Sequence, residues 1–177
     1  MTQGRGVWVS DYQAPLFFAW QLTNRCQAKC LHCCEESGPD KAWARELNKD
    51  EALHITRQIV EAGVAEVAFG GGEPLGVPFF WEILRVLHEG RVGIKIETNG
   101  LLISENEADE LARLEADCIQ LSVDGASAET HEKVRPGGDF RGVLRAFALL
   151  TSRDLAPEFV FVPNKLNIKE GGKAFEL

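Results

Sequence analysis

Five short runs of aliphatic and aromatic residues recur along the chain, and segments with helical features separate them. The runs cover residues 16–20, 64–69, 92–97, 118–123 and 158–162. Each has the length of one buried strand. Parallel strands need crossover connections, and helices supply them. The alternation therefore predicts a parallel α/β fold, either a doubly wound sheet or a barrel.

The intervening segments carry recognisable helix ends. Capping boxes, in which a polar residue is followed three positions later by Glu, predict helix starts at Asn48 and Ser104. Gly63 suits the stop of the first of these helices. Pro78 suits the first position of another helix, and a fourth helix is predicted over residues 141–152.

Composition limits the classes of protein that this chain can represent. With 177 residues, 45% of them hydrophobic, the chain can bury a sizeable core as one domain, which we place at residues 15–177 after a lead-in at 1–14. The net charge of −8 disfavours binding to nucleic acid or to anionic membrane surfaces. No apolar run approaches the ~20 residues of a membrane span, and no signal peptide is recognisable, so we expect a cytoplasmic protein.

Three cysteines, Cys26, Cys30 and Cys33, follow the first apolar run within eight residues. Thiolates at this spacing can hold three corners of an iron–sulfur cubane and leave the fourth iron open. The spacing favours an iron–sulfur site, although it does not by itself exclude other uses of these thiols.

Two other readings of the cysteines stay open on spacing alone. A structural zinc site usually has four ligands in two pairs, but here the further thiols are Cys34, adjacent to the triad, and Cys118, far along the chain. His32 lies inside the same tight loop, where closing a tetrahedral site would strain it. Disulfides are disfavoured because the count of five is odd and no secretory signal is recognisable.

Glycine-rich or polar residues follow three further strands, at the edge where parallel α/β folds bind ligands. Each of these segments alone is typical of a turn, but together they predict one shared rim. Three consecutive glycines let the backbone approach a ligand closely, and the following Glu73 adds a carboxylate that suits a positively charged amine. The segments are 70–74, 98–100 and 122–125.

Together these residues resemble the radical S-adenosylmethionine superfamily, over about residues 15–167. The resemblance rests on the cysteine triad, on Gly71–Pro74 after the second strand and on Ser122–Gly125 at the fourth. Residues 22–26, with His131 and Arg135, are most similar to peptide and cofactor maturases of the SPASM type and to alternative-haem synthases. The resemblance implies a partial TIM-like barrel of parallel strands.

The resemblance also implies roles for individual residues. The three cysteines would hold a [4Fe–4S] cluster whose open iron binds the amino and carboxylate groups of S-adenosylmethionine. His32 occupies a usually aromatic position near the adenine, and Asn167 stands where relatives often have an asparagine. Gly71, Gly72 and Glu73 match the loop that receives the methionine ammonium, whereas Thr98, Ser122, Asp124 and Arg135 match contacts to the methionine carboxylate or the ribose.

The implied activity is reductive cleavage of S-adenosylmethionine to a 5′-deoxyadenosyl radical, which abstracts hydrogen from a substrate. The implied partners are a peptide or cofactor precursor as substrate and an electron donor such as flavodoxin or ferredoxin. For His131 we expect a structural role rather than proton transfer.

The predicted strands number five, whereas members of this superfamily typically build six βα units. We therefore expect the chain to be a fragment, a frameshifted product, or half of a split enzyme whose barrel another chain completes. The competing hypotheses are a truncated, non-catalytic cluster-binding module and a zinc-binding α/β domain.

Overall fold

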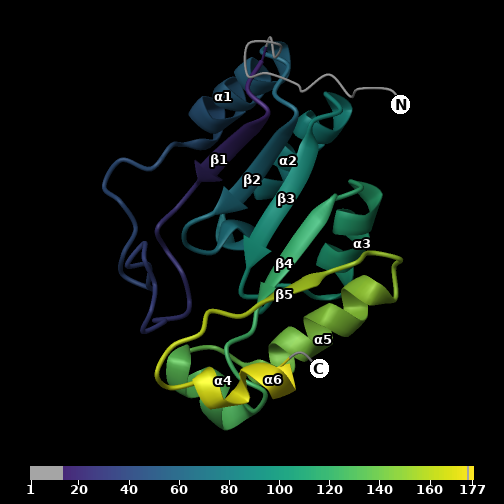
Figure 1. Cartoon of the computed structure of the whole chain (residues 1–177). Coiled ribbons are helices and arrows are strands. Elements are labelled where there is room, and N and C mark those ends of the chain that lie inside the picture. Colours follow the sequence, from purple (N-terminus) through teal and green to yellow (C-terminus); the bar gives the residue numbers. More distant parts are fainter. Residues whose placement is uncertain (1–13, 175) are drawn as a thin grey trace, which may run out of the picture.

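Five parallel strands form a single sheet in the order β1-β2-β3-β4-β5, as Figure 1 shows. The computed structural model describes residues 14–174 and 176–177, so the expected lead-in lies almost wholly outside the described part. Strand order follows chain order without the reversal of a doubly wound sheet, so the barrel-like alternative is confirmed. The strands are β1 (Phe17–Gln21), β2 (Glu66–Gly70), β3 (Gly93–Thr98), β4 (Cys118–Ser122) and β5 (Glu158–Val160).

Helices α1, α2, α3 and α5 cover one face of this sheet (Figure 1). The strand residues beneath them alternate with exposed positions and form the main core, with Phe69, Ile96 and Leu121 fully buried. The helices of the described residues are α1 (Lys49–Glu61), α2 (Phe80–Glu89), α3 (Glu105–Arg113), α4 (Ala128–Val134), α5 (Phe140–Thr151) and α6 (Gly171–Ala174).

Both predicted capping boxes are present. The Asn48 side chain accepts from the Glu51 N–H at 3.1 Å while Glu51 accepts from the Asn48 N–H at 2.9 Å, and Ser104 with Glu107 closes the second box. The prediction for Pro78 was wrong: α2 begins at Phe80, because a 3₁₀ turn at Pro74–Gly76 precedes it and Val77 is extended.

The opposite face of the sheet is open. It is polar over β3, β4 and the start of β5, whereas Phe17 and Ala19 on β1 and Ala68 on β2 add apolar side chains to it. Lys95 and Glu97 on β3, Gln120 on β4 and Glu158 on β5 occupy the alternate positions, and all four are partly or fully exposed. Parallel sheets are usually covered on both faces and apolar on both, so this face differs from the norm. In the part of the chain that the structure describes, no helix is long and apolar enough to span a membrane.

Candidate active site

The cysteine triad lies in the loop between β1 and α1, close to the carboxyl ends of the strands. Cys26, Cys30 and Cys33 are free and half-buried, and all three line one cavity of about 270 Å³. The loop folds on itself, since the Cys26 N–H donates to Gly38 O at 3.1 Å and the Ser37 N–H to Cys33 Sγ at 3.3 Å. The thiols therefore face a shared space. Cys34 is exposed and also borders it.

Two backbone hydrogen bonds join this loop to the segment after α4. The Lys29 N–H donates to Pro136 O at 2.7 Å, and the Leu31 N–H donates to Val134 O at 3.0 Å. Residues separated by about a hundred positions in sequence are thus held side by side, and the fourth βα unit supports one side of the cysteine loop.

The glycines after β2 support its other side. The Gly72 N–H donates to Thr23 O at 2.8 Å, and the Glu73 N–H donates to Arg25 O at 2.9 Å. A Cβ on Gly72 would lie 2.3 Å from Arg25 O, so only glycine allows this approach. We expected these glycines to face a ligand. They do border the cavity, but the Gly72 and Glu73 N–H groups are already engaged by the cysteine loop.

Glu73 is buried at the floor of the cavity and accepts three hydrogen bonds. Thr98 Oγ1 donates to it at 2.8 Å, the Asn99 N–H at 2.9 Å and the Leu75 N–H at 3.2 Å. Burial raises the pKa of Glu73 to about 7, although these three bonds oppose the shift. Thr98 therefore orients Glu73 as well as bordering the cavity.

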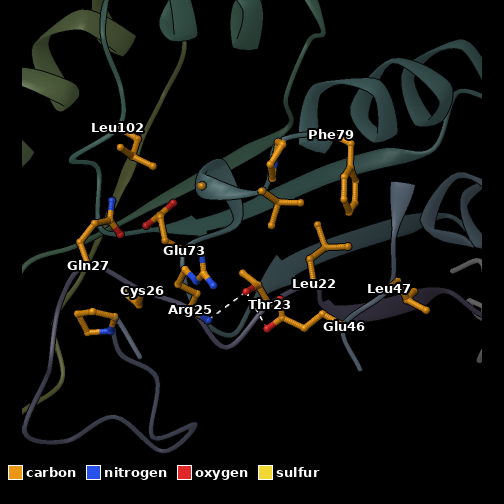
Figure 2. A pocket seen from close by; sticks show the side chains of 14 residues that line it. Leu22, Thr23, Arg25, Cys26, Gln27, Glu46, Leu47, Glu73, Phe79 and Leu102 are labelled. Atoms are coloured by element: carbon orange, nitrogen blue, oxygen red, sulfur yellow. Dashed lines mark hydrogen bonds between the residues drawn. The ribbon is translucent and has the colours of Figure 1, made fainter. Parts of the chain in front are cut away.

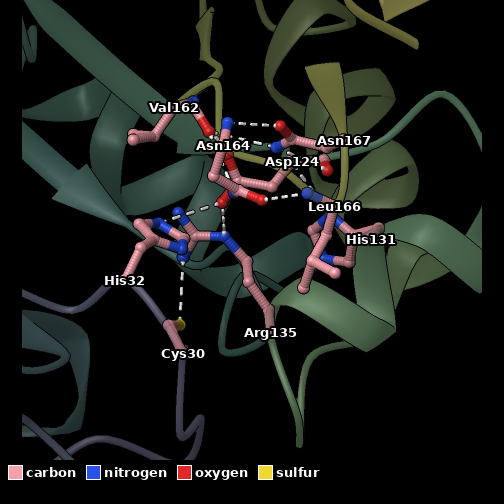
Figure 3. A network of polar contacts seen from close by, with 9 residues as sticks. All are labelled: Cys30, His32, Asp124, His131, Arg135, Val162, Asn164, Leu166 and Asn167. Atoms are coloured by element: carbon pink, nitrogen blue, oxygen red, sulfur yellow. Dashed lines mark hydrogen bonds and ion pairs between the residues drawn. The ribbon is translucent and has the colours of Figure 1, made fainter. Parts of the chain in front are cut away.

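A second charged group, Asp124, lies within a network of polar contacts that includes Arg135 and His32 (Figure 3) and does not itself line the cavity. It is fully buried, and its Oδ2 accepts from Arg135 Nε at 2.5 Å and lies 3.2 Å from His32 Nε2. Its other oxygen accepts from the Val162 N–H at 2.8 Å. Asp124 was expected to touch the cofactor directly, but the residues that reach the cavity are Arg135 and His32, which Asp124 positions.

Arg135 continues this network to the triad, because its Nη1 donates to Cys30 Sγ at 3.4 Å. Burial raises the pKa of the Cys30 thiol, and the Arg135 charge opposes that shift. Burial lowers the pKa of His32, and the negative charge of Asp124 opposes that shift. His32 Nδ1 is buried and has no hydrogen-bond partner among the described residues. A buried nitrogen without a partner is costly unless a ligand satisfies it.

Two asparagines hold the site from behind. The sequence analysis named Asn167 from the resemblance alone and included Asn99 only within the rim segment 98–100. Asn99 Nδ2 lies 3.6 Å from Cys26 Sγ and donates to Gln27 Oε1 at 3.1 Å. Asn167 Nδ2 donates to Asp124 O at 3.2 Å and to Val162 O at 3.0 Å. Asn99 contacts a cysteine, whereas Asn167 stays fully buried as a support.

Two further predicted positions have clear places. Ser122 ends β4 and borders the cavity beside Thr98. His131 is buried in α4, and its Nδ1 accepts from the Asp124 N–H at 3.2 Å. His131 thus contacts backbone and does not line the cavity. This agrees with the structural role that we expected for it.

A second cavity of about 440 Å³ lies on the other side of Cys26 and Glu73 (Figure 2). Its lining is largely apolar and includes Leu22, Phe79 and Leu102. The charged side chain of Arg25 also lines it. Cys26 and Glu73 therefore border both cavities.

The arrangement of the donor groups bears on which metal centre could bind here. Within residues 14–174 and 176–177, no three His, Cys, Asp or Glu side chains converge as ligands of one ion. Zinc needs that convergence, because each thiolate sulfur lies about 2.3 Å from it. In a cubane each cysteine binds a different iron, so the sulfurs stand apart around the cluster. Three thiols around one cavity fit the cluster and give no support to the zinc hypothesis.

Known proteins resemble this chain in sequence and in fold. The family model described as the radical SAM superfamily matches residues 20–167. The mycofactocin maturase MftC of Mycobacterium ulcerans is 36% identical over 143 residues, which are 81% of this chain and 38% of that protein. The AdoMet-dependent heme synthase of Methanosarcina barkeri is 32% identical over 166 residues, 93% of this chain and 47% of that protein.

Solved structures agree at the level of the fold. Streptococcus suis SuiB bound to S-adenosylmethionine superposes with a TM-score of 0.79 at 18% identity, over 93% of this chain and 38% of SuiB. The chain thus spans less than half the length of each of these relatives. The family model covers most of the sequence, and the observed sheet, cavity and cysteine loop agree with that family. The chain therefore belongs to the radical SAM superfamily.

Proposed function

We propose that this chain is the core of an enzyme that binds a [4Fe–4S] cluster and S-adenosylmethionine and cleaves the latter reductively. The observation that carries the proposal is that Cys26, Cys30 and Cys33 border one cavity together with the polar residues at the strand ends. When bound, the reduced cluster supplies the electron that converts S-adenosylmethionine into methionine and a 5′-deoxyadenosyl radical, which abstracts hydrogen from the substrate.

The residues of the chain bind and orient. The three thiols hold three irons as thiolates, because metal binding deprotonates a coordinating thiol. Arg135, fixed by Asp124, offers a positive charge at the cavity for a carboxylate. Glu73 borders the cavity together with Gly71 and Gly72, and its carboxyl group is the proposed partner of an ammonium, whose charge would favour the ionised form that burial disfavours.

His32 and Ser122 complete the proposed cofactor contacts. The free Nδ1 of His32 is the buried atom that a hydrogen-bond donor or acceptor of the adenine would satisfy. Ser122 provides a hydroxyl at the end of β4 for the ribose or the carboxylate. Thr98 acts through Glu73, to which it donates.

The substrate is proposed to be a peptide or a cofactor precursor. Relatives support both classes, since one is named a maturase and another a heme synthase. SuiB, whose fold is similar, was solved with its precursor peptide SuiA bound. The electron donor is proposed to be a flavodoxin or ferredoxin. The five unpaired thiols in the described residues support a reducing, cytoplasmic location.

Anaerobic reconstitution with iron and sulfide tests the proposal. We expect about four irons per chain and, with S-adenosylmethionine and dithionite, release of 5′-deoxyadenosine. Cys30→Ala and Cys33→Ala should lose the cluster, whereas Cys118→Ala should keep it because Cys118 lies on β4 away from the loop.

Two outcomes would contradict the proposal. A cluster-loaded protein that releases no 5′-deoxyadenosine would support a non-catalytic module instead. Loss of the cluster in Cys34→Ala with retention in Cys33→Ala would show that the wrong thiol had been assigned.

A further inference from the structure

A row of polar side chains crosses the open face of the sheet at one level of the strand register. Gln21 pairs with Gly70, Glu97 with Gln120, and Gln120 with Glu158 in the register of the strands. Gly70 lies beside Glu97, because the preceding residues of β2 and β3 are partners. Gln120 Nε2 donates to Glu158 Oε2 at 2.9 Å. Four strands thus contribute amide or carboxylate groups to one row, and β2 contributes Gly70, which has no side chain.

This row adjoins the cavity of the cysteine triad. Glu97 and Gly70 border that cavity together with Thr98 and Ser122. The Glu97 side chain is 54% exposed. A Cβ on Gly70 would lie 3.3 Å from Glu97 Oε2, so the glycine leaves room beside the carboxylate. A molecule that enters from the open face therefore meets this row immediately next to the proposed cofactor.

The charge on this face is predominantly negative. Glu66, Glu97 and Glu158 lie on it, against the single ammonium of Lys95, which is 3.8 Å from Glu97 Oε1. Cys118 stands among them, with its Sγ 3.7 Å from Glu158 Oε2. Such a face attracts cations and hydrogen-bond donors, and it repels carboxylates.

We propose that this row, Gln21, Glu97, Gln120 and Glu158, is the substrate-contacting surface and that it selects a peptide segment with a basic side chain. The inference rests on the proposed function, because it takes the neighbouring cavity as the cofactor site. Amide side chains pair with the N–H and C=O groups of a peptide backbone, and the carboxylates pair with an ammonium or guanidinium. A carboxylate-rich porphyrin would place like charges against Glu97 and Glu158.

Cys118 provides a reporter for occupancy of this face that does not depend on catalysis. Its tryptic peptide, Leu114–Lys133, contains no other cysteine. The rate at which N-ethylmaleimide alkylates Cys118 in the full chain can therefore be read by mass spectrometry. The probes are acetyl-Gly-Lys-Gly-Lys-Gly-amide, the same peptide with Glu in place of Lys, and a tetracarboxylate porphyrin.

We expect the lysine peptide to slow alkylation of Cys118 by about threefold or more, and the two anionic probes to leave it unchanged. In the double variant Glu97→Gln/Glu158→Gln the protection should disappear. Because Glu158 also affects the thiol itself, protection is taken as the ratio of rates with and without peptide in each variant. Glu61→Gln, an equal charge change on the exposed side of α1, is the control and should keep the protection.

Equal protection by the lysine and glutamate peptides, protection by the porphyrin, or full protection in the double variant would each overturn the inference. Release of 5′-deoxyadenosine is measured separately. A chain that cleaves S-adenosylmethionine without this charge preference refutes the inference alone, whereas a chain that shows the preference and cleaves nothing refutes the proposed function alone.

Discussion

The guanidinium of Arg135 donates to the thiol of Cys30, with 3.4 Å between Nη1 and Sγ. The same guanidinium forms an ion pair with the buried Asp124, and the Arg135 side chain is only 11% exposed. One side chain therefore links the cysteine loop to the fourth βα unit and places a positive charge beside a prospective thiolate.

Replacing Arg135 by Met should destabilise the fold by about 3–5 kcal/mol, because it leaves Asp124 as an uncompensated buried charge. The measurement is urea-induced unfolding of the cluster-free chain. Arg145→Met is the matched control: its ion pair with Asp139 is exposed on both sides, so we expect a change of at most about 1 kcal/mol. Equal stability of the two variants would show that Asp124 does not depend on Arg135.

Gly72→Ala should separate the cysteine loop from the β2 loop. The new Cβ would meet Arg25 O at 2.3 Å, and backbone rather than a flexible side chain has to move. We expect a loss of about 1–3 kcal/mol in the free energy of unfolding together with reduced iron incorporation. Gly76→Ala, whose Cβ would find its nearest neighbour at 3.7 Å, serves as the control. A variant at Gly72 that behaves like the one at Gly76 would contradict this account.

The titration of Glu73 should appear in the pH dependence of stability. Burial raises the pKa of Glu73 to about 7 in the folded chain, while the unfolded chain releases this proton near pH 4.5. Between these values the folded state binds more protons, so the contribution of Glu73 to the free energy of unfolding falls as pH rises.

Comparison with Glu73→Gln isolates this effect, since the amide does not titrate. The difference in unfolding free energy, wild type minus variant, should decrease from pH 5 to pH 8 in urea titrations. The exposed Glu61→Gln variant should give a difference that does not change with pH in this way. A constant difference for Glu73 would mean that its hydrogen bonds outweigh its burial.

Asn99 should tune the thiol of Cys26. Burial raises the pKa of Cys26, and hydrogen bonds from the Ala28 backbone and the Asn99 side chain oppose the shift. In Asn99→Asp, a carboxylate replaces the donating amide, while the acceptor for the Leu101 N–H remains. The midpoint of Cys26 alkylation by iodoacetamide should therefore move to higher pH.

Mass spectrometry of the tryptic peptide Cys26–Lys29 reads this midpoint for Cys26 alone. Asn99→Ala should shift it less than Asn99→Asp, because it removes the donor without adding a charge. An unchanged midpoint for both variants would show that the contact of 3.6 Å has no influence on the thiol.

The alternation of strands and helices was predictable because each strand has a buried apolar side and because capping boxes mark two of the helix starts, at Asn48 and Ser104. The bounds moved by one or two residues, as for the first strand, predicted at 16–20 and found at Phe17–Gln21. Helix α4 was missed, since seven residues are too few for a 3.6-residue apolar pattern. The open, polar face could have been suspected from the alternation in Gly93–Thr98.

The candidate site was predictable where chemistry is local in sequence. The spacing of the three cysteines indicated the triad, and the position of Ser122 near the end of the fourth apolar run placed it at the rim. Asn99 was predicted only as part of the rim segment 98–100 and was given no role of its own, since nothing in the sequence indicates a contact across 73 positions. For Asp124 the sequence could not reveal that burial would place it behind Arg135.

The backbone bonds from Lys29 to Pro136 and from Leu31 to Val134 have a consequence for biosynthesis. A nascent chain that has extended only through the third βα unit contains all three cysteines. It lacks the segment 134–136, whose backbone carbonyl groups bind the cysteine loop. Such long-range contacts form late, after the costly closure of the intervening chain. Cluster insertion should therefore wait until translation has passed Pro136, and shorter nascent chains should carry these thiols unshielded.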